Sequence, residues 1–214
     1  MKAPVNGIQL YYEWHGPEEA EPLVLLNGIL MSTPSWAGQV PDLSRRYHLL
    51  LHDCRGQGQS DHPAGPYSMD QHAEDLRALL DYLGLDRIHL AGISYGGEIA
   101  LIFAARWPER VRSLFVSSAA SEVHTHLRCR VEAWMAAART GQGEQLYRCS
   151  VADNYSEPWL AARPGLAQTA IPRFEALDLP AVVELCQAFL NLDFTADLKH
   201  ITAPTTLVVG ELDS

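Results

Sequence analysis

The chain has 214 residues, enough for one domain of ordinary size. Hydrophobic residues make up 47% and charged residues 20% of it, which excludes a disordered chain and a collagen-like repeat. The formal net charge of -10 argues against a nucleic-acid partner. No apolar run approaches the ~18 residues that a membrane helix needs, so we expect no membrane association.

Four scattered cysteines, Cys54, Cys129, Cys149 and Cys186, have neither the spacing of a metal site nor that of paired disulfides. Free thiols are typical of a reducing compartment. We therefore predict a cytoplasmic protein, and we find no pattern for a metal, nucleotide or flavin cofactor.

Strands are predicted first. Residues 2–5 and 9–14 flank Asn6-Gly7, a pair that favours a two-residue hairpin turn. Residues 23–26 are apolar throughout, and a strand without alternation is typically covered on both faces, as in a parallel sheet. Further strands of this kind are predicted at residues 47–52, 87–91, 113–116 and 205–209.

Helical patterns separate these strands. Ser68 and Gln71 form a capping pair, and the apolar stripe that follows stops at Gly84. A second helix is predicted over residues 96–107, ending at Pro108. This alternation indicates an α/β fold with a doubly wound, mostly parallel sheet.

Between residues 121 and 198 the alternation stops. This stretch is rich in Ala, Leu, Arg and Gln, is interrupted by prolines and contains no convincing strand. It predicts several short helices that form a cap over one end of the sheet. The expected organisation is a core over residues 1–120, a helical cap over residues 121–198 and a last core strand within residues 199–214.

The segment Gly92-Ile93-Ser94-Tyr95-Gly96 places a serine on the turn between a predicted strand and a predicted helix. Glycines on both sides suit a turn in which the serine backbone is strained. This context indicates a nucleophilic serine. The alternative is a glycine-rich turn in which the serine is incidental.

Together with residues 23–28, 53–60 and 208–213, in that order, this motif resembles the α/β-hydrolase superfamily along the whole chain. The nearest likeness is to small capped members such as esterases and enol-lactone hydrolases. The resemblance implies that Ser94 is the nucleophile and that Asp213 is the acid that orients a catalytic histidine. It also implies an oxyanion hole made by the backbone N–H groups of Ile29 and Tyr95.

Four residues are candidates for the substrate pocket. Asn27 stands where relatives more often have histidine, and Leu30 follows in the same loop. Trp134 and Trp159 belong to the predicted cap. The alternatives are a plain turn residue for Asn27 and ordinary core for the aromatic side chains.

The resemblance places the catalytic histidine after one more strand, so we expect it beyond residue 214, together with a final strand and helix. A substitute base among His62, His124 and His126 is the alternative, since these lie in loops expected near the serine. Without another strand, residues 205–209 would form a bare apolar edge, which could pair with a second copy of the chain or with a C-terminal fragment.

We therefore predict a serine hydrolase that cleaves a small-molecule ester or lactone through an acyl-enzyme on Ser94, with no cofactor. An acyltransferase on the same scaffold and a catalytically inactive, ligand-binding protein are the alternatives. The 214-residue chain itself is expected to be impaired.

Overall fold

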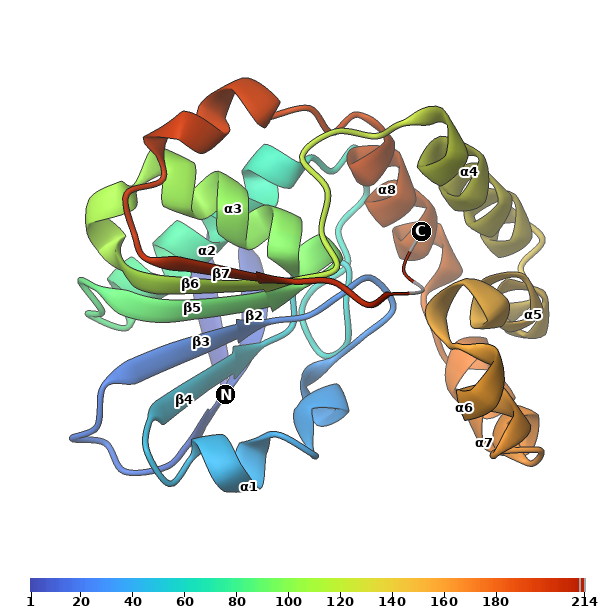
Figure 1. The fold of residues 1–214 in the computed structure, drawn as a ribbon, viewed down its shortest axis with the longest axis horizontal. Coiled ribbons are helices and arrows are strands. Elements are labelled where there is room, and N and C mark those ends of the chain that lie inside the picture. Colours follow the sequence, from blue (N-terminus) through green and yellow to red (C-terminus); the bar gives the residue numbers. More distant parts are fainter. Residues whose placement is uncertain (212, 214) are drawn as a thin grey trace.

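The computed structural model describes residues 1–211 and 213, which form a seven-stranded sheet flanked by helices (Figure 1). The strand order is β1-β2-β4-β3-β5-β6-β7. Strands β3 to β7 are parallel, whereas β1 and β2 form an antiparallel hairpin that joins the sheet beside β4. The strands span β1 (Lys2–Val5), β2 (Ile8–His15), β3 (Pro22–Leu26), β4 (His48–His52), β5 (Ile88–Ile93), β6 (Val111–Ser117) and β7 (Thr205–Val208).

Helices cover the sheet unequally. One face carries α2 (Met69–Tyr82), α3 (Tyr95–Arg106) and the 3₁₀ helix η3 (Thr195–His200), and the other carries the short α1 (Val40–Leu43) (Figure 1). Two further 3₁₀ helices are η1 (Thr33–Trp36) and η2 (Pro108–Arg110). Beyond one end of the sheet lie α4 (Thr125–Arg139), α5 (Gly143–Asn154), α6 (Glu157–Ala161), α7 (Leu166–Glu175) and α8 (Leu179–Leu190). None of the described helices is long and apolar enough to cross a membrane.

The strand β3 shows why these strands lack alternation. Its residues Val24 and Leu26 enter the large core beneath α2 and α3, whereas Leu23 and Leu25 pack in a second cluster with Trp36 and α1. Both faces of the strand are therefore buried in apolar surroundings, as the continuous apolar run predicts.

The hairpin turn and the helix cap predicted from the sequence are both confirmed. Asn6 and Gly7 have φ values of 46° and 78°, which a two-residue hairpin turn of this hand requires. The Ser68 hydroxyl accepts a hydrogen bond from the Gln71 N–H at 3.1 Å and caps α2. Between β6 and β7 the regular elements of the described chain are helices, apart from a single bridge between Glu122 and Asp193.

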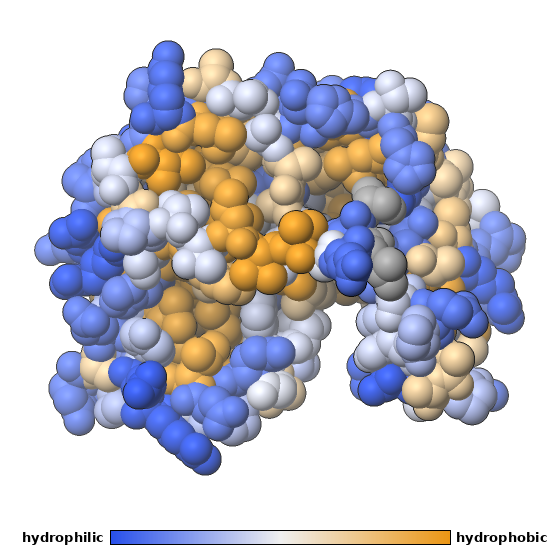
Figure 2. Space-filling view, in the orientation of Figure 1, coloured by the Kyte–Doolittle hydropathy of each residue, from blue (hydrophilic) through white to orange (hydrophobic). Residues whose placement is uncertain are grey.

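The strand β7 forms an apolar edge. Leu207 is 69% and Val209 is 71% exposed, and Phe115 on the adjacent β6 is also exposed. Figure 2 shows hydrophobic side chains gathered across the middle of this face of the molecule. Among the described residues β7 pairs with β6 alone, so its other edge offers free N–H and C=O groups beside apolar side chains.

We predict that the 214-residue chain associates with itself through this edge. Replacing both Leu207 and Val209 by lysine should return the mass measured by light scattering to that of one chain, because charge on an edge strand opposes pairing. Tyr82→Lys, at an exposed apolar position on α2, is the control and should leave the association unchanged. A wild-type chain that stays monomeric at high concentration would contradict this prediction.

Two buried histidines lie beneath the start of α3. His52 and His72 are each 2% exposed, and none of their ring nitrogens has a hydrogen-bond partner among the described residues. The His72 ring packs edge-on against the Tyr95 ring, with centroids 5.3 Å apart. Burial lowers the pKa of His52 to about 4 and that of His72 to about 3, so both are neutral in the folded protein at neutral pH.

Histidines of this kind make the folded state sensitive to acid. Since the unfolded chain binds protons near pH 6.5 and the folded chain does not, stability should fall as the pH drops below 6.5. Between pH 6.5 and pH 4 the free energy of unfolding should fall by roughly 3 kcal/mol less in His72→Phe than in the wild type, by the rule of about 1.4 kcal/mol per pH unit. Urea unfolding at several pH values measures this, with the exposed His124→Phe as control. An unchanged pH slope for His72→Phe would contradict the assignment.

Candidate active site

Ser94 occupies the turn between β5 and α3. Its backbone has φ 50° and ψ -124°, a conformation that residues with a side chain rarely adopt. The Ser94 N–H donates to the Ser117 carbonyl at 2.8 Å. Its own carbonyl accepts from the N–H groups of Gly97 at 2.6 Å and Glu98 at 3.0 Å. These contacts fix the serine at the carboxyl end of the sheet.

Two glycines make this turn possible because the backbone packs too closely for a side chain. A Cβ atom on Gly96 would overlap the carbonyl oxygen of Leu26 at the end of β3. A Cβ atom on Gly92 would overlap the carbonyl oxygen of Gly96 across the turn. The start of α3 is therefore pressed directly against β3 and β5, which aims Ser94 away from the sheet.

Substituting one of these glycines tests the packing. We expect Gly96→Ala to lower the free energy of unfolding by about 1–3 kcal/mol and to abolish reaction at Ser94, because the carbonyl of Leu26 cannot move without disturbing β3. Gly38→Ala is the matched control, since a Cβ atom there meets no other atom within 4 Å. Equal stability of the two variants in urea would show that the overlap is relieved elsewhere.

A cavity of about 820 Å³ opens above Ser94, between the sheet and the cap helices. The predicted residues Ile29, Ser94, Tyr95, Trp134 and Asp213 all line it. Other lining residues come from α3, the loop after β6, α4, the end of α5 and the residue after it, and α8, and include Glu98, Ser118, His126, Arg130, Asp153, Tyr155 and Phe189. The tertiary structure thus brings together five predicted residues from four separate parts of the sequence.

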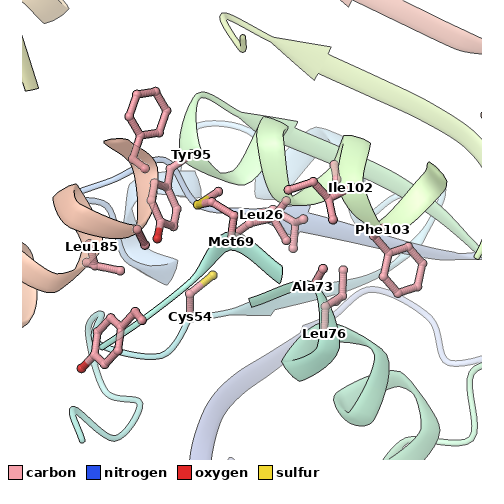
Figure 3. Close-up of a cluster of buried hydrophobic side chains, with 14 of the residues drawn as sticks. Leu26, Cys54, Met69, Ala73, Leu76, Tyr95, Ile102, Phe103 and Leu185 are labelled. Carbon is pink, nitrogen blue, oxygen red and sulfur yellow. The ribbon is translucent and has the colours of Figure 1, made fainter. Parts of the chain in front are cut away.

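Two backbone N–H groups at the cavity wall are free to bind an anion. No acceptor for the N–H of Ile29 or of Tyr95 is found among the described residues, and both residues line the cavity beside Ser94. The Tyr95 N–H belongs to the first turn of α3, where helix geometry leaves donors without a partner. The Tyr95 side chain turns into the core near Met69 and Leu185 (Figure 3), which anchors its backbone.

The structure places three of the predicted pocket residues outside the large cavity. Asn27 is fully buried outside the cavity: its side-chain amide donates to the His52 carbonyl at 3.0 Å and accepts from the Trp36 indole N–H at 2.7 Å. Its hydrogen-bond capacity is used within the fold, so it braces the loop after β3. Leu30 lines a separate cavity of about 80 Å³.

Trp159 also lies outside the large cavity. Its ring stacks on the Tyr155 ring at a centroid distance of 4.1 Å, and the Arg163 guanidinium lies 4.0 Å from the centroid of the Trp159 ring. Of this group, Tyr155 rather than Trp159 reaches the cavity wall.

The histidines are distributed as follows. His62 pairs with Asp178 at 2.9 Å beside the small cavity, and the exposed His124 lies 3.5 Å from Glu122. His126 lines the large cavity. None of the nine histidines has a described contact with Ser94 or Asp213. The catalytic histidine that the resemblance places beyond residue 214 lies outside the described residues.

The cap contributes a charged cluster to the cavity wall. The Trp134 indole N–H donates to the Asp153 carboxylate at 2.8 Å, and the Arg130 guanidinium lies 3.4 Å from the other oxygen of that carboxylate. These contacts tie α4 to the end of α5 and orient Trp134 at the cavity. No group of three potential metal ligands is found among the described residues.

Among the cavity residues that sequence reasoning missed, Glu98 is the one buried within α3. It is 1% exposed and follows Ser94 by one turn of α3. Burial raises the pKa of its carboxyl group to about 8. The available signal was a single acidic residue in the apolar stretch Gly96–Phe103, where Ile99, Ile102 and Phe103 point to a fully buried helix.

Comparison with known proteins shows the family of the chain. Residues 21–144 match the family model described as the alpha/beta hydrolase fold. The chain belongs to this family. It is 27% identical to 3-oxoadipate enol-lactonase 2 of Acinetobacter baylyi, over 96% of this chain and 76% of that protein. It is 32% identical to a putative carbamate hydrolase, RutD, of Stutzerimonas stutzeri, over 95% of this chain and 79% of that protein.

The fold is shared with solved members of the family. The crystal structure of the enol-lactonase from Burkholderia xenovorans LB400 superposes with a TM-score of 0.90 at 26% identity, covering 99% of this chain and 81% of that one. The doubly wound sheet with its helical cap, expected from the sequence, is thus confirmed.

Proposed function

We propose that this protein is a serine hydrolase of carboxylic esters or lactones and that Ser94 is its nucleophile. The observation that carries the proposal is the backbone of Ser94, held at φ 50° at the edge of a large cavity and next to two free N–H groups. Strain of this kind costs of order 1–3 kcal/mol and persists where it positions a reacting group.

Each step of the proposed reaction is assigned to a group that lines the cavity or to the histidine expected beyond residue 214. The Ser94 Oγ attacks the carbonyl carbon, and its proton passes to a histidine oriented by Asp213. The N–H groups of Ile29 and Tyr95 bind the oxyanion of the tetrahedral intermediate, each contributing about 3 kcal/mol. The histidine then protonates the leaving alcohol, and water cleaves the acyl-enzyme to release the acid.

The substrate class follows from the cavity and the relatives. Trp134 and Phe189 offer apolar surface to an acyl group, while the wall near α4 and α5 is polar. The two relatives named above are an enol-lactonase and a putative carbamate hydrolase, and both names denote hydrolysis of a bond at a carbonyl carbon. We therefore assign an ester or lactone with a small or medium acyl group.

Reaction at Ser94 can be tested in two ways. A fluorophosphonate probe should label the wild-type chain once, at Ser94, and should not label Ser94→Ala. In a protein that also carries the histidine expected beyond residue 214, hydrolysis of short chromogenic acyl esters should fall at least about 10³-fold in Ser94→Ala, since loss of the nucleophile removes the covalent route.

Ser156→Ala is the matched control for both measurements. Ser156 also lines the cavity, but its hydroxyl makes no hydrogen bond among the described residues. We expect this variant to be labelled and to hydrolyse like the wild type. Labelling at a residue other than Ser94, or equal turnover by Ser94→Ala, would refute the proposal.

A further inference from the structure

Three side chains of the cap form a stacked row that begins at the end of α5. Tyr155 directly follows α5, Trp159 lies in α6, and Arg163 lies just beyond α6. The Tyr155 and Trp159 rings are nearly parallel, with centroids 4.1 Å apart and an interplanar angle of 10°. The Arg163 guanidinium lies 4.0 Å from the centroid of the Trp159 ring. The reaction proposed above gives this row no role.

Tyr155 is the member of the row that meets the cavity. It belongs to the wall of the cavity that holds Ser94, whereas Trp159 and Arg163 do not. Tyr155 stays 43% exposed although Trp159 covers one face of its ring. The main chain is a small part of the surface of a tyrosine, so most of this exposed area belongs to the other ring face and the ring edge. Tyr155 therefore offers accessible aromatic surface to a ligand in the cavity.

The row also fixes the direction of the Tyr155 ring. An exposed tyrosine without packing neighbours samples several rotamers, and a ligand that stacks on it must bear the entropy cost of ordering it. Here the stack with Trp159 orders the ring in advance, and the cation over Trp159 holds that second ring in place. A ligand that stacks on Tyr155 is spared this cost.

An ordered aromatic face discriminates between planar and saturated groups. Two aromatic rings gain more from stacking than the burial of their apolar area provides, because the charge distributions of their π systems are complementary in offset geometry. A saturated ring of the same size is puckered and has no π system, so it gains from burial alone. The exposed face of Tyr155 thus suits a ligand that carries an aromatic ring.

We propose that Tyr155 is a specificity-determining residue whose open ring face stacks on an aromatic ring of the substrate. The substrate class is then an ester that carries an aryl group. This inference rests on the proposed function, since it assumes an ester bound with its carbonyl group at Ser94. Trp159 and Arg163 are positioning residues that act through Tyr155.

The test measures binding in a Ser94→Ala background, so that it does not depend on turnover. Dissociation constants are obtained by ligand-observed NMR titration for two pairs of esters. Benzyl acetate and cyclohexylmethyl acetate carry the ring on the alcohol, and methyl phenylacetate and methyl cyclohexylacetate carry it on the acyl group. The ratio of the two constants within a pair is compared between variants, which cancels the greater hydrophobicity of the saturated ring.

Tyr155→Leu should shift this ratio about fivefold against the aromatic ester, which is the size of one aromatic pair. The pair that shifts identifies the side of the ester that carries the aryl group. Tyr155→Phe keeps the ring and should leave the ratio unchanged, and Trp159→Leu should shift it by a smaller factor in the same direction as Tyr155→Leu. Tyr82→Leu is the control, because Tyr82 is 53% exposed on α2 and does not line the cavity.

A ratio that Tyr155→Leu leaves unchanged in both pairs would overturn the assignment, even in a protein that hydrolyses esters at Ser94. An equal shift in Tyr155→Phe would also overturn it, because the ring face would then not be the determinant. A ratio that depends on Tyr155, in a protein without Ser94-dependent hydrolysis, would contradict the proposed function alone. Binding of none of the four esters would count against both.

Discussion

The close approach of α3 to β3 and β5 is the constraint on which the site depends. Because Gly96 lies against the carbonyl of Leu26, the helix can begin immediately after β5, and Ser94 must turn through a positive φ to connect them. The same approach leaves the Tyr95 N–H at the helix start without an acceptor. The Ser94 side chain and the Tyr95 N–H donor are thus placed side by side by a single packing contact.

The helix that carries this turn is buried from Tyr95 to Ala105, and its depth decides the charge of the groups around it. His72 beneath it and Glu98 within it both favour their neutral forms, with pKa values of about 3 and about 8. Their effects on stability have opposite signs. The histidine makes folding less favourable as the pH falls below 6.5, whereas the glutamate does so as the pH rises from 4.5 toward 8.

Family and fold do not choose the substrate, because the sheet and the turn are shared while the cavity is built by the cap. In this chain the cap supplies Trp134, held by Asp153, and Phe189 from α8. The core adds Glu98 from below. The cavity wall is thus assembled from two parts of the chain that are more than 30 residues apart.

The sequence by itself determined the strands, the hairpin turn, the capped helix and the glycine–serine turn. Each of these depends on backbone propensity or on burial patterns within a few neighbouring residues, such as Asn6-Gly7 or residues 23–26. The motif likewise singled out Ser94, Tyr95 and Ile29, which do share one cavity.

Only the tertiary structure decided which side chains face that cavity. Asn27 lies two positions before the lining residue Ile29, yet its side-chain amide is hydrogen-bonded to the His52 carbonyl and the Trp36 indole N–H. Trp159 stacks within the cap instead, and Glu98 stands in the cavity wall although it resembles an ordinary helix residue. The physical reason is that hydrogen-bond partners and burial are set by segments distant in the chain, which local patterns cannot specify.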